Sequence, residues 1–217
     1  MCSQSVDTPV LVQFELPKEW GELIDAYVAT GDTAKLDELL ATPLFAGRRY
    51  DGRTSSAFLS LIRRLRAMAE AGRSVRVAGF QPSWFSIAPQ YYYELDMAHG
   101  LARRAAEHEG AINLVLVGSY HARRSAPADE RYSAASFLRD EDYIALRVCP
   151  EGGTASTLTR DGEAIRELDD IAAGTARGIY APSHFELSAL RDQRLFDGYV
   201  CVGRPATASP RAVPQAE

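Results

Sequence analysis

Two side chains that could do chemistry each follow an apolar run of the chain. His121 follows residues 112–117 (INLVLV) within a Gly-Ser-Tyr-His-Ala segment, and Glu15 follows residues 10–14 (VLVQF). An imidazole can bind a metal, transfer a proton or donate a hydrogen bond. A carboxylate can accept a proton or bind a cation. For His121 the alternative is a solvated loop histidine, and position alone leaves both interpretations open.

These two side chains meet if their runs form neighbouring parallel strands. A short Val- and Leu-rich run such as residues 112–117 is typical of a strand buried on both faces of a parallel sheet. Open α/β sheets bind ligands just outside the carboxyl ends of their strands. Because Glu15, His121 and the loop that begins at Gln81 all follow predicted strands, we expect them to share one crevice.

Glu15 and His121 offer the oxygen and nitrogen donors that bind Zn²⁺ or a similar divalent ion. A catalytic zinc ion takes three protein ligands, so a third donor is needed. His99 is a candidate, but its place at the edge of an apolar helix face favours a structural or solvated role. His108, at a helix end, is interpreted as structural, and His184 is interpreted as a loop residue.

The order of strand and helix signals indicates the fold class. Strands are expected at residues 10–14, 75–80, 112–117, 143–148 and 196–202, with amphipathic helices between most of them. The order β-α-α-β-α-β-α-β favours an α/β fold, with a mostly parallel sheet and helices on both faces. We expect a single domain over residues 1–204 and a disordered tail, rich in Pro, Ala and Ser, over residues 205–217.

Further side chains could contact a ligand. Asp51 and Arg53 lie in a polar loop, where they form a local salt bridge or face an anionic substrate. Trp84 and the tyrosines at 91–93, Tyr93 included, could stack on a flat ligand such as a porphyrin. Packing with hydroxyls that reach solvent is the alternative for such a tyrosine cluster.

Composition excludes several classes of protein. A net charge of −5 over 217 residues gives no general attraction to nucleic acid or anionic membranes, and no apolar run approaches the roughly 18 residues of a membrane span. No export signal is visible, which favours the cytoplasm. Cys149 and Cys201 lie in predicted strands and could pair if those strands are adjacent, but buried free thiols are favoured.

The order of several motifs suggests a family. Residues 9–17 (PVLVQFELP) match a strand that ends in LEIP, and residues 51–57 (DGRTSSA) match DGRxSxA. Glu94 and residues 96–98 fit RDxxMA, and residues 117–123 (VGSYHAR) fit VGNxHA, with late motifs at 152–155 and 196–204. Over most of its length the chain thus resembles the ChaN-like haem-binding uptake proteins of the Tiki and erythromycin-esterase-like superfamily.

This resemblance implies an α/β fold with a metal-dependent hydrolytic centre in some branches and haem binding in another. It maps the family's last histidine onto His121 and its second-strand glutamate onto Glu15. The implied reaction is hydrolysis of an ester or amide bond in a small molecule by metal-bound hydroxide. The alternatives are a protein that binds haem through residues 91–93 or His121, and a homologue without catalysis.

The chain also departs from the family pattern. Family members begin with a further strand that ends in GExH, and the residues before Val10 do not encode it. The family's arginine falls at Tyr93, an aspartate at Gln81 and an asparagine at Ser119. An apolar sheet edge left by a missing strand would lower solubility, which favours a start site placed too far downstream. A longer form could then be a periplasmic protein or a lipoprotein.

Overall fold

A parallel sheet lies at the centre of the computed structural model, which describes residues 8–46, 52–82, 89–124, 132–138, 143–159, 162–168, 178–180, 195–203 and 205–209. Its order is β2-β1-β3, from β1 (Val10–Pro17), β2 (Val75–Gln81) and β3 (Ile112–Leu116). Both neighbours run parallel to β1. The predicted α/β class with a parallel sheet is thereby confirmed. A single domain with helices over both faces of the whole sheet stays a prediction.

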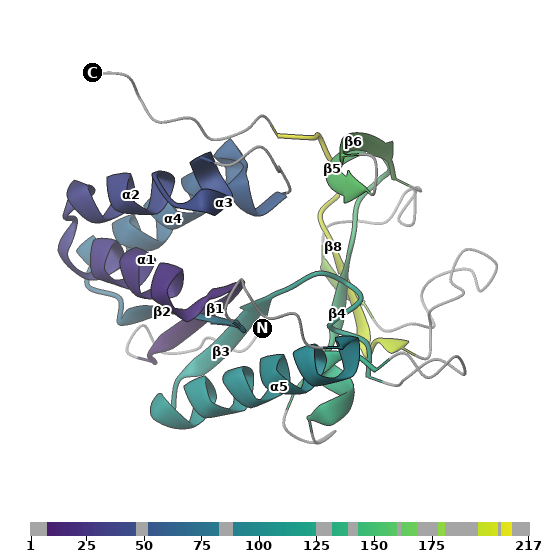
Figure 1. The fold of residues 1–217 in the computed structure, drawn as a ribbon, viewed down its shortest axis with the longest axis horizontal. Coiled ribbons are helices and arrows are strands. Elements are labelled where there is room, and N and C mark those ends of the chain that lie inside the picture. Colours follow the sequence, from purple (N-terminus) through teal and green to yellow (C-terminus); the bar gives the residue numbers. More distant parts are fainter. Residues whose placement is uncertain are drawn as a thin grey trace.

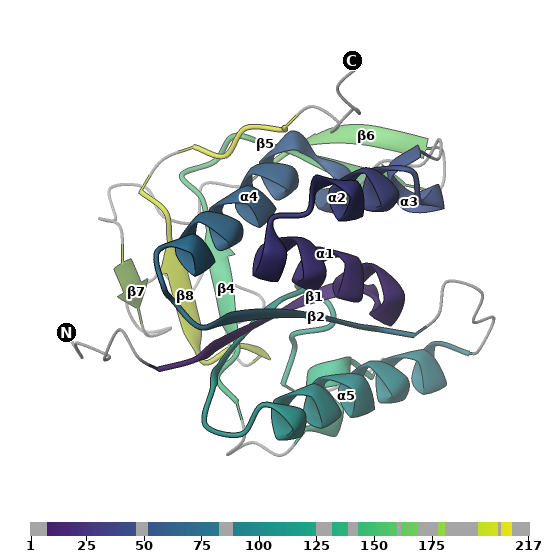
Figure 2. The ribbon, with the colours of Figure 1, turned by 90° about the vertical axis from the view of Figure 1, so that its left-hand side faces the viewer.

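Five α-helices and a short 3₁₀ helix belong to this first part of the chain: α1 (Lys18–Thr30), α2 (Thr33–Leu40), α3 (Pro43–Ala46), η1 (Gly52–Thr54), α4 (Ser56–Glu70) and α5 (Gln90–Glu107). In Figures 1 and 2, α1, α2 and α4 are grouped on one side of β1 and β2, and α5 lies on the other. Helix α1 approaches β2 so closely that a Cβ on Gly21 would lie 2.0 Å from the backbone nitrogen of Gly79. Only a residue without a side chain fits there.

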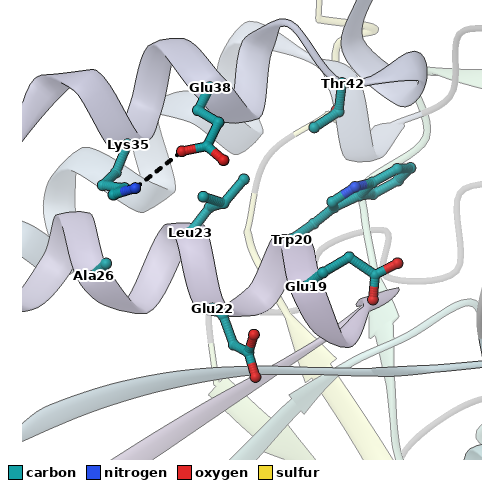
Figure 3. Close-up of a pocket in the computed structure, with 8 residues that line it drawn as sticks. All are labelled: Glu19, Trp20, Glu22, Leu23, Ala26, Lys35, Glu38 and Thr42. Atoms are coloured by element: carbon teal, nitrogen blue, oxygen red, sulfur yellow. Dashed lines mark hydrogen bonds and ion pairs between the residues drawn. The ribbon is translucent and has the colours of Figure 1, made fainter.

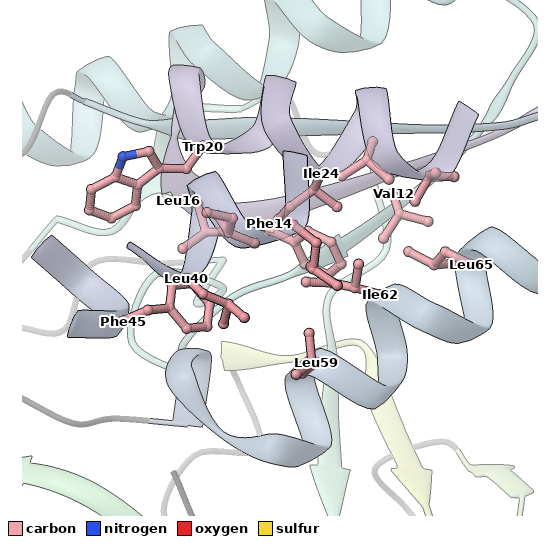
Figure 4. Close-up of a cluster of buried hydrophobic side chains, with 14 of the residues drawn as sticks. Val12, Phe14, Leu16, Trp20, Ile24, Leu40, Phe45, Leu59, Ile62 and Leu65 are labelled. Carbon is pink, nitrogen blue, oxygen red and sulfur yellow. The ribbon is translucent and has the colours of Figure 1, made fainter. Parts of the chain in front are cut away.

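The main core forms between β1 and the grouped helices (Figure 4). Alternate residues of β1 point toward it, because successive side chains of a strand face opposite sides. They pack against apolar residues of α1, α2, α3 and α4, and the cluster includes Val12, Phe14, Leu16, Trp20, Ile24, Leu40, Phe45, Leu59, Ile62 and Leu65. The opposite set of β1 positions includes Gln13 and Glu15, so the strand carries its polar side chains away from this core.

Strand β3 differs from its prediction. Its apolar run indicated a strand buried on both faces, but Leu114, Val115 and Leu116 are 49%, 41% and 46% exposed. The reason is position: among the described residues β3 pairs only with β1 and forms an edge of the sheet. The expectation of a doubly buried strand is therefore wrong.

The later strands form separate sheets. Strand β8 (Gly198–Cys201) pairs in parallel with β4 (Leu146–Cys149) and antiparallel with β7 (Gly178–Tyr180). Strands β5 (Thr154–Thr159) and β6 (Gly162–Glu167) form an antiparallel pair. The 3₁₀ helix η2 (Ala134–Phe137) lies between β3 and β4 along the chain.

A disulfide joins β4 to β8. Cys149 and Cys201 are opposite each other in the strand register, with their Cα atoms 4.7 Å apart. Both cysteines are buried. The free-thiol interpretation favoured by the sequence is wrong, because strands 52 residues apart in sequence are neighbours in space.

The first residues of the expected tail contact the rest of the chain. Ala206 forms a β-bridge with Gly153, and the Ser209 hydroxyl accepts a hydrogen bond from the backbone nitrogen of Ala57 at the start of α4. Residues 210–217 lie outside the described residues, and a disordered tail stays a prediction. Of the helices that the structure describes, none combines the length and the apolar character that crossing a bilayer requires.

Candidate active site

The carboxyl ends of β1 and β3 bring Glu15 and His121 together. Oε2 of Glu15 accepts a hydrogen bond of 2.8 Å from the backbone nitrogen of Gly118, just beyond β3. Oε1 of the same carboxylate lies 3.8 Å from Nε2 of His121. This is the juxtaposition that adjacent parallel strands predict. Both side chains are largely buried, at 14% and 16% exposure.

Glu94 is the site residue that sequence reasoning missed as a partner of His121. Its Oε2 lies 2.8 Å from Nδ1 of His121 and accepts a second hydrogen bond, of 2.7 Å, from the backbone nitrogen of Ala134. Its Oε1 accepts a hydrogen bond from the side-chain amide of Gln90. The carboxylate is completely buried. Glu94 lies in line with the apolar positions 97, 98 and 101 of α5, and an acidic residue within such a stripe was the available signal.

The two carboxylates and burial shift the pKa of His121 in opposite directions. Burial of the ring lowers the pKa of His121, but the hydrogen bond to Glu94 and the charges of Glu15 and Glu94 together outweigh it. Arg53 lowers the pKa slightly in turn, and the net pKa lies above the ordinary value for histidine. His121 is thus a stronger base than a histidine in solution.

Arg53 completes a polar chain across the site. Its Nη1 donates to Oε1 of Glu15 at 3.1 Å, to the Glu15 carbonyl at 3.0 Å and to Oε1 of Gln81 at 3.4 Å. The Gln81 amide in turn donates to the Tyr93 hydroxyl. Burial raises the pKa of Tyr93, which keeps this hydroxyl protonated. Of the three predicted ligand-binding residues, Arg53 and Tyr93 therefore lie at the site, whereas Asp51 lies outside the described residues.

Neither of the other two described histidines, His99 and His108, adds a ligand to the site. His99 is exposed on α5, in agreement with a solvated role, and His108 follows the end of that helix. His184 and Trp84 lie outside the described residues.

The donor set does not fit a catalytic metal ion. Within the described ranges, no three His, Cys, Asp or Glu side chains are placed to hold one. The Arg53 guanidinium already contacts the Glu15 oxygen that faces His121, and it would repel a divalent cation there. His121 does not fit a haem iron either. Its Nδ1 is held by Glu94, and an iron on Nε2 would displace Glu15 from Arg53 and Gly118.

A surface hollow lies elsewhere, between α1 and α2 (Figure 3). An ion pair of 3.0 Å between Lys35 and Glu38 crosses part of it, and its lining also includes Trp20, Leu23 and Thr42. None of its lining residues contributes to the chain of contacts from Glu94 to Tyr93, so this hollow is separate from the candidate site.

Comparison with known proteins agrees on the fold. No protein-family model and no curated protein sequence matches the chain. Two solved structures are similar to it. One is a histidine-to-asparagine mutant of erythromycin esterase EreC in its open conformation, with a TM-score of 0.61 and 9% identity over 95% of this chain and 85% of that chain. The other is a succinoglycan biosynthesis protein, with a TM-score of 0.60 and 10% identity over 93% and 81%.

At this level of identity the likeness shows the fold alone. The erythromycin esterase-like architecture that the motifs suggested is supported, and it extends over nearly the whole chain. The first strand ending in GExH, haem uptake and metal binding stay predictions.

Proposed function

We propose that this protein hydrolyses an ester or amide bond in a small molecule, with His121 as the general base. One observation carries the proposal: a fully buried carboxylate, Glu94, contacts Nδ1 of His121 and leaves Nε2 directed toward Glu15. A carboxylate that accepts a hydrogen bond from Nδ1–H fixes the imidazole tautomer in which Nε2 is free to accept a proton.

The nucleophile in this proposal is water. Nε2 of His121 and Oε1 of Glu15 are 3.8 Å apart, which allows one water molecule to hydrogen-bond to both. Nε2 removes a proton from this water as its oxygen bonds to the substrate carbonyl carbon. The imidazolium then gives the proton to the departing alcohol or amine as the tetrahedral intermediate collapses. Glu94 stabilises the imidazolium between the two transfers.

The negative charge that develops on the carbonyl oxygen during the reaction must be stabilised within the same site. Arg53 brings a guanidinium to the site, and Tyr93 brings a hydroxyl that its raised pKa keeps protonated. Positive charge and hydrogen-bond donors in a site largely shielded from water stabilise an oxyanion strongly. The proposed reaction requires no metal ion, in line with the donor set that the described residues provide. The name of the similar esterase EreC adds support for the reaction class.

A hydrolysis assay on metal-free protein tests the proposal. The wild-type protein and the variants His121→Ala and His99→Ala are treated with EDTA and dialysed. Each is then assayed with 4-nitrophenyl esters and anilides. We expect His121→Ala to lower kcat/KM by about 10²- to 10⁴-fold, the usual contribution of a general base. The exposed His99 is the matched control, and its substitution leaves the rate unchanged.

Two results would contradict the proposal. Hydrolysis by His121→Ala at the wild-type rate would remove the imidazole from the mechanism. Recovery of activity only when Zn²⁺ or another divalent ion is returned would show that a metal supplies the nucleophile after all.

A further inference from the structure

Four aromatic side chains gather where α5 meets η2, and we call them the aromatic cluster: Tyr91, Tyr92, Tyr132 and Phe137. The ring of Tyr91 lies edge-on to the other three, with centroids 5.0–5.3 Å away. The rings of Tyr132 and Phe137 are stacked, 5.5 Å apart and 24° from parallel. Aromatic rings attract one another in both of these arrangements.

The aromatic cluster keeps much of its surface in water. Tyr91, Tyr92 and Tyr132 are 42%, 56% and 39% exposed, so mutual packing leaves a substantial part of each side chain uncovered. Contiguous exposed apolar surface on a soluble protein commonly marks a place where a ligand binds. None of the four side chains carries a charge, so the cluster offers a ligand ring faces and hydroxyl groups rather than an ion pair.

The segments that carry the aromatic cluster also carry or contact residues of the candidate site. Tyr91 precedes Glu94 by three residues on α5, so both lie on one face of the helix. The Tyr120 hydroxyl donates to the carbonyl of Tyr132 at 3.0 Å, and the Tyr120 ring packs edge-on against His121 with centroids 5.5 Å apart. Helix α5 thus carries both Tyr91 and Glu94, and Tyr120 links Tyr132 to His121.

We propose that the aromatic cluster binds a flat, uncharged ring of the substrate, on the face of α5 that also carries Glu94. That the ring belongs to a substrate rests on the hydrolytic function proposed above, whereas ring binding itself does not. The substrate class is then an aromatic ester or amide rather than a short aliphatic one. Stacking on exposed tyrosine rings holds such a ring while the carbonyl reaches His121.

Binding is measured apart from catalysis. The ligand is 2-naphthol, the product of naphthyl ester hydrolysis, and its binding is measured by calorimetric titration. The proteins are the His121→Ala variant and two double variants that add Tyr91→Ala or Tyr132→Ala to it. We expect each alanine to weaken binding by about 3- to 10-fold, the range for loss of an aromatic contact. Tyr91→Phe keeps the ring and is expected to bind as before. Ile179→Ala, at an exposed position on β7, is the matched surface control.

Thermal unfolding of each variant separates lost binding from lost structure, and Tyr91→Phe provides a folded reference. Equal naphthol affinity in all variants, no measurable binding, or stronger binding of tetramethylammonium than of naphthol would each overturn the proposal. Active protein gives a second readout, because Tyr91→Ala should lower kcat/KM for 2-naphthyl acetate by about the same 3- to 10-fold and leave kcat/KM for ethyl acetate unchanged. Absence of all hydrolysis would refute the catalytic function and leave the naphthol result to decide ring binding.

Discussion

Glu94 and His121 are 27 residues apart in sequence and 2.8 Å apart in space. The pair joins a helix, α5, to the segment that follows β3, and the backbone nitrogen of Ala134 holds the same carboxylate oxygen. Because the carboxylate is fully buried, the ion pair it can form with His121 is shielded from solvent and salt. This contact determines which nitrogen of the imidazole faces Glu15.

Opposite shifts of the pH–rate profile are expected when the charges beside His121 are removed one at a time. The base acts only when deprotonated, so activity falls as the pH drops through the pKa of His121. Glu15 raises that pKa and Arg53 lowers it. Glu15→Gln should therefore move the acidic limb of kcat/KM to lower pH, and Arg53→Gln should move it to higher pH. Two shifts in the same direction would show that another group titrates.

The Cys149–Cys201 disulfide predicts a single free thiol. The chain has three cysteines, so thiol titration of the denatured, unreduced protein should find one per chain, and Cys2→Ser should remove it. Replacing Cys149 and Cys201 by alanine should lower the free energy of unfolding by about 2–4 kcal/mol in denaturant titrations. Three titratable thiols in protein prepared without reductant would contradict the pairing.

Asp25 is expected to stabilise the fold at the edge of β2. Its Oδ1 accepts from the backbone nitrogen of Val77 at 2.7 Å, and both carboxylate oxygens contact the Arg76 guanidinium. Asp25→Ala leaves that N–H without its acceptor and should lower the free energy of unfolding by about 1–3 kcal/mol. The control is Glu22→Ala, which removes an exposed ion pair with Lys18 and should cost less than about 0.5 kcal/mol. Equal effects of the two substitutions would contradict this role.

Local sequence pattern predicted the strands that carry the site. The apolar runs before Glu15 and His121 indicated parallel strands, and parallel strands end at the same edge, so the meeting of these side chains followed from topology. The pattern did not predict which strand lies at an edge. The exposure of Leu114 depends on what packs beside β3 rather than on the residues of β3 itself.

Two other contacts between distant segments could not be predicted from local sequence pattern, because they depend on how whole elements pack. The partner of His121 comes from a helix, and its choice depends on how α5 is placed against β2. The disulfide depends on β4 and β8 being neighbours, although 52 residues separate the two cysteines. A buried acidic residue in an apolar helix stripe, as at Glu94, is the one such signal visible in the sequence.

The pH–rate profile of Glu94→Gln tests the central claim most directly. The amide keeps the size of the side chain but removes the charge that raises the pKa of His121 and supports its protonated form. With a 4-nitrophenyl ester and metal-free protein, we predict a kcat lowered by about 10²-fold or more and an acidic limb moved to lower pH. A variant with wild-type kcat and an unmoved limb would contradict the account, because His121 would then work without its buried partner.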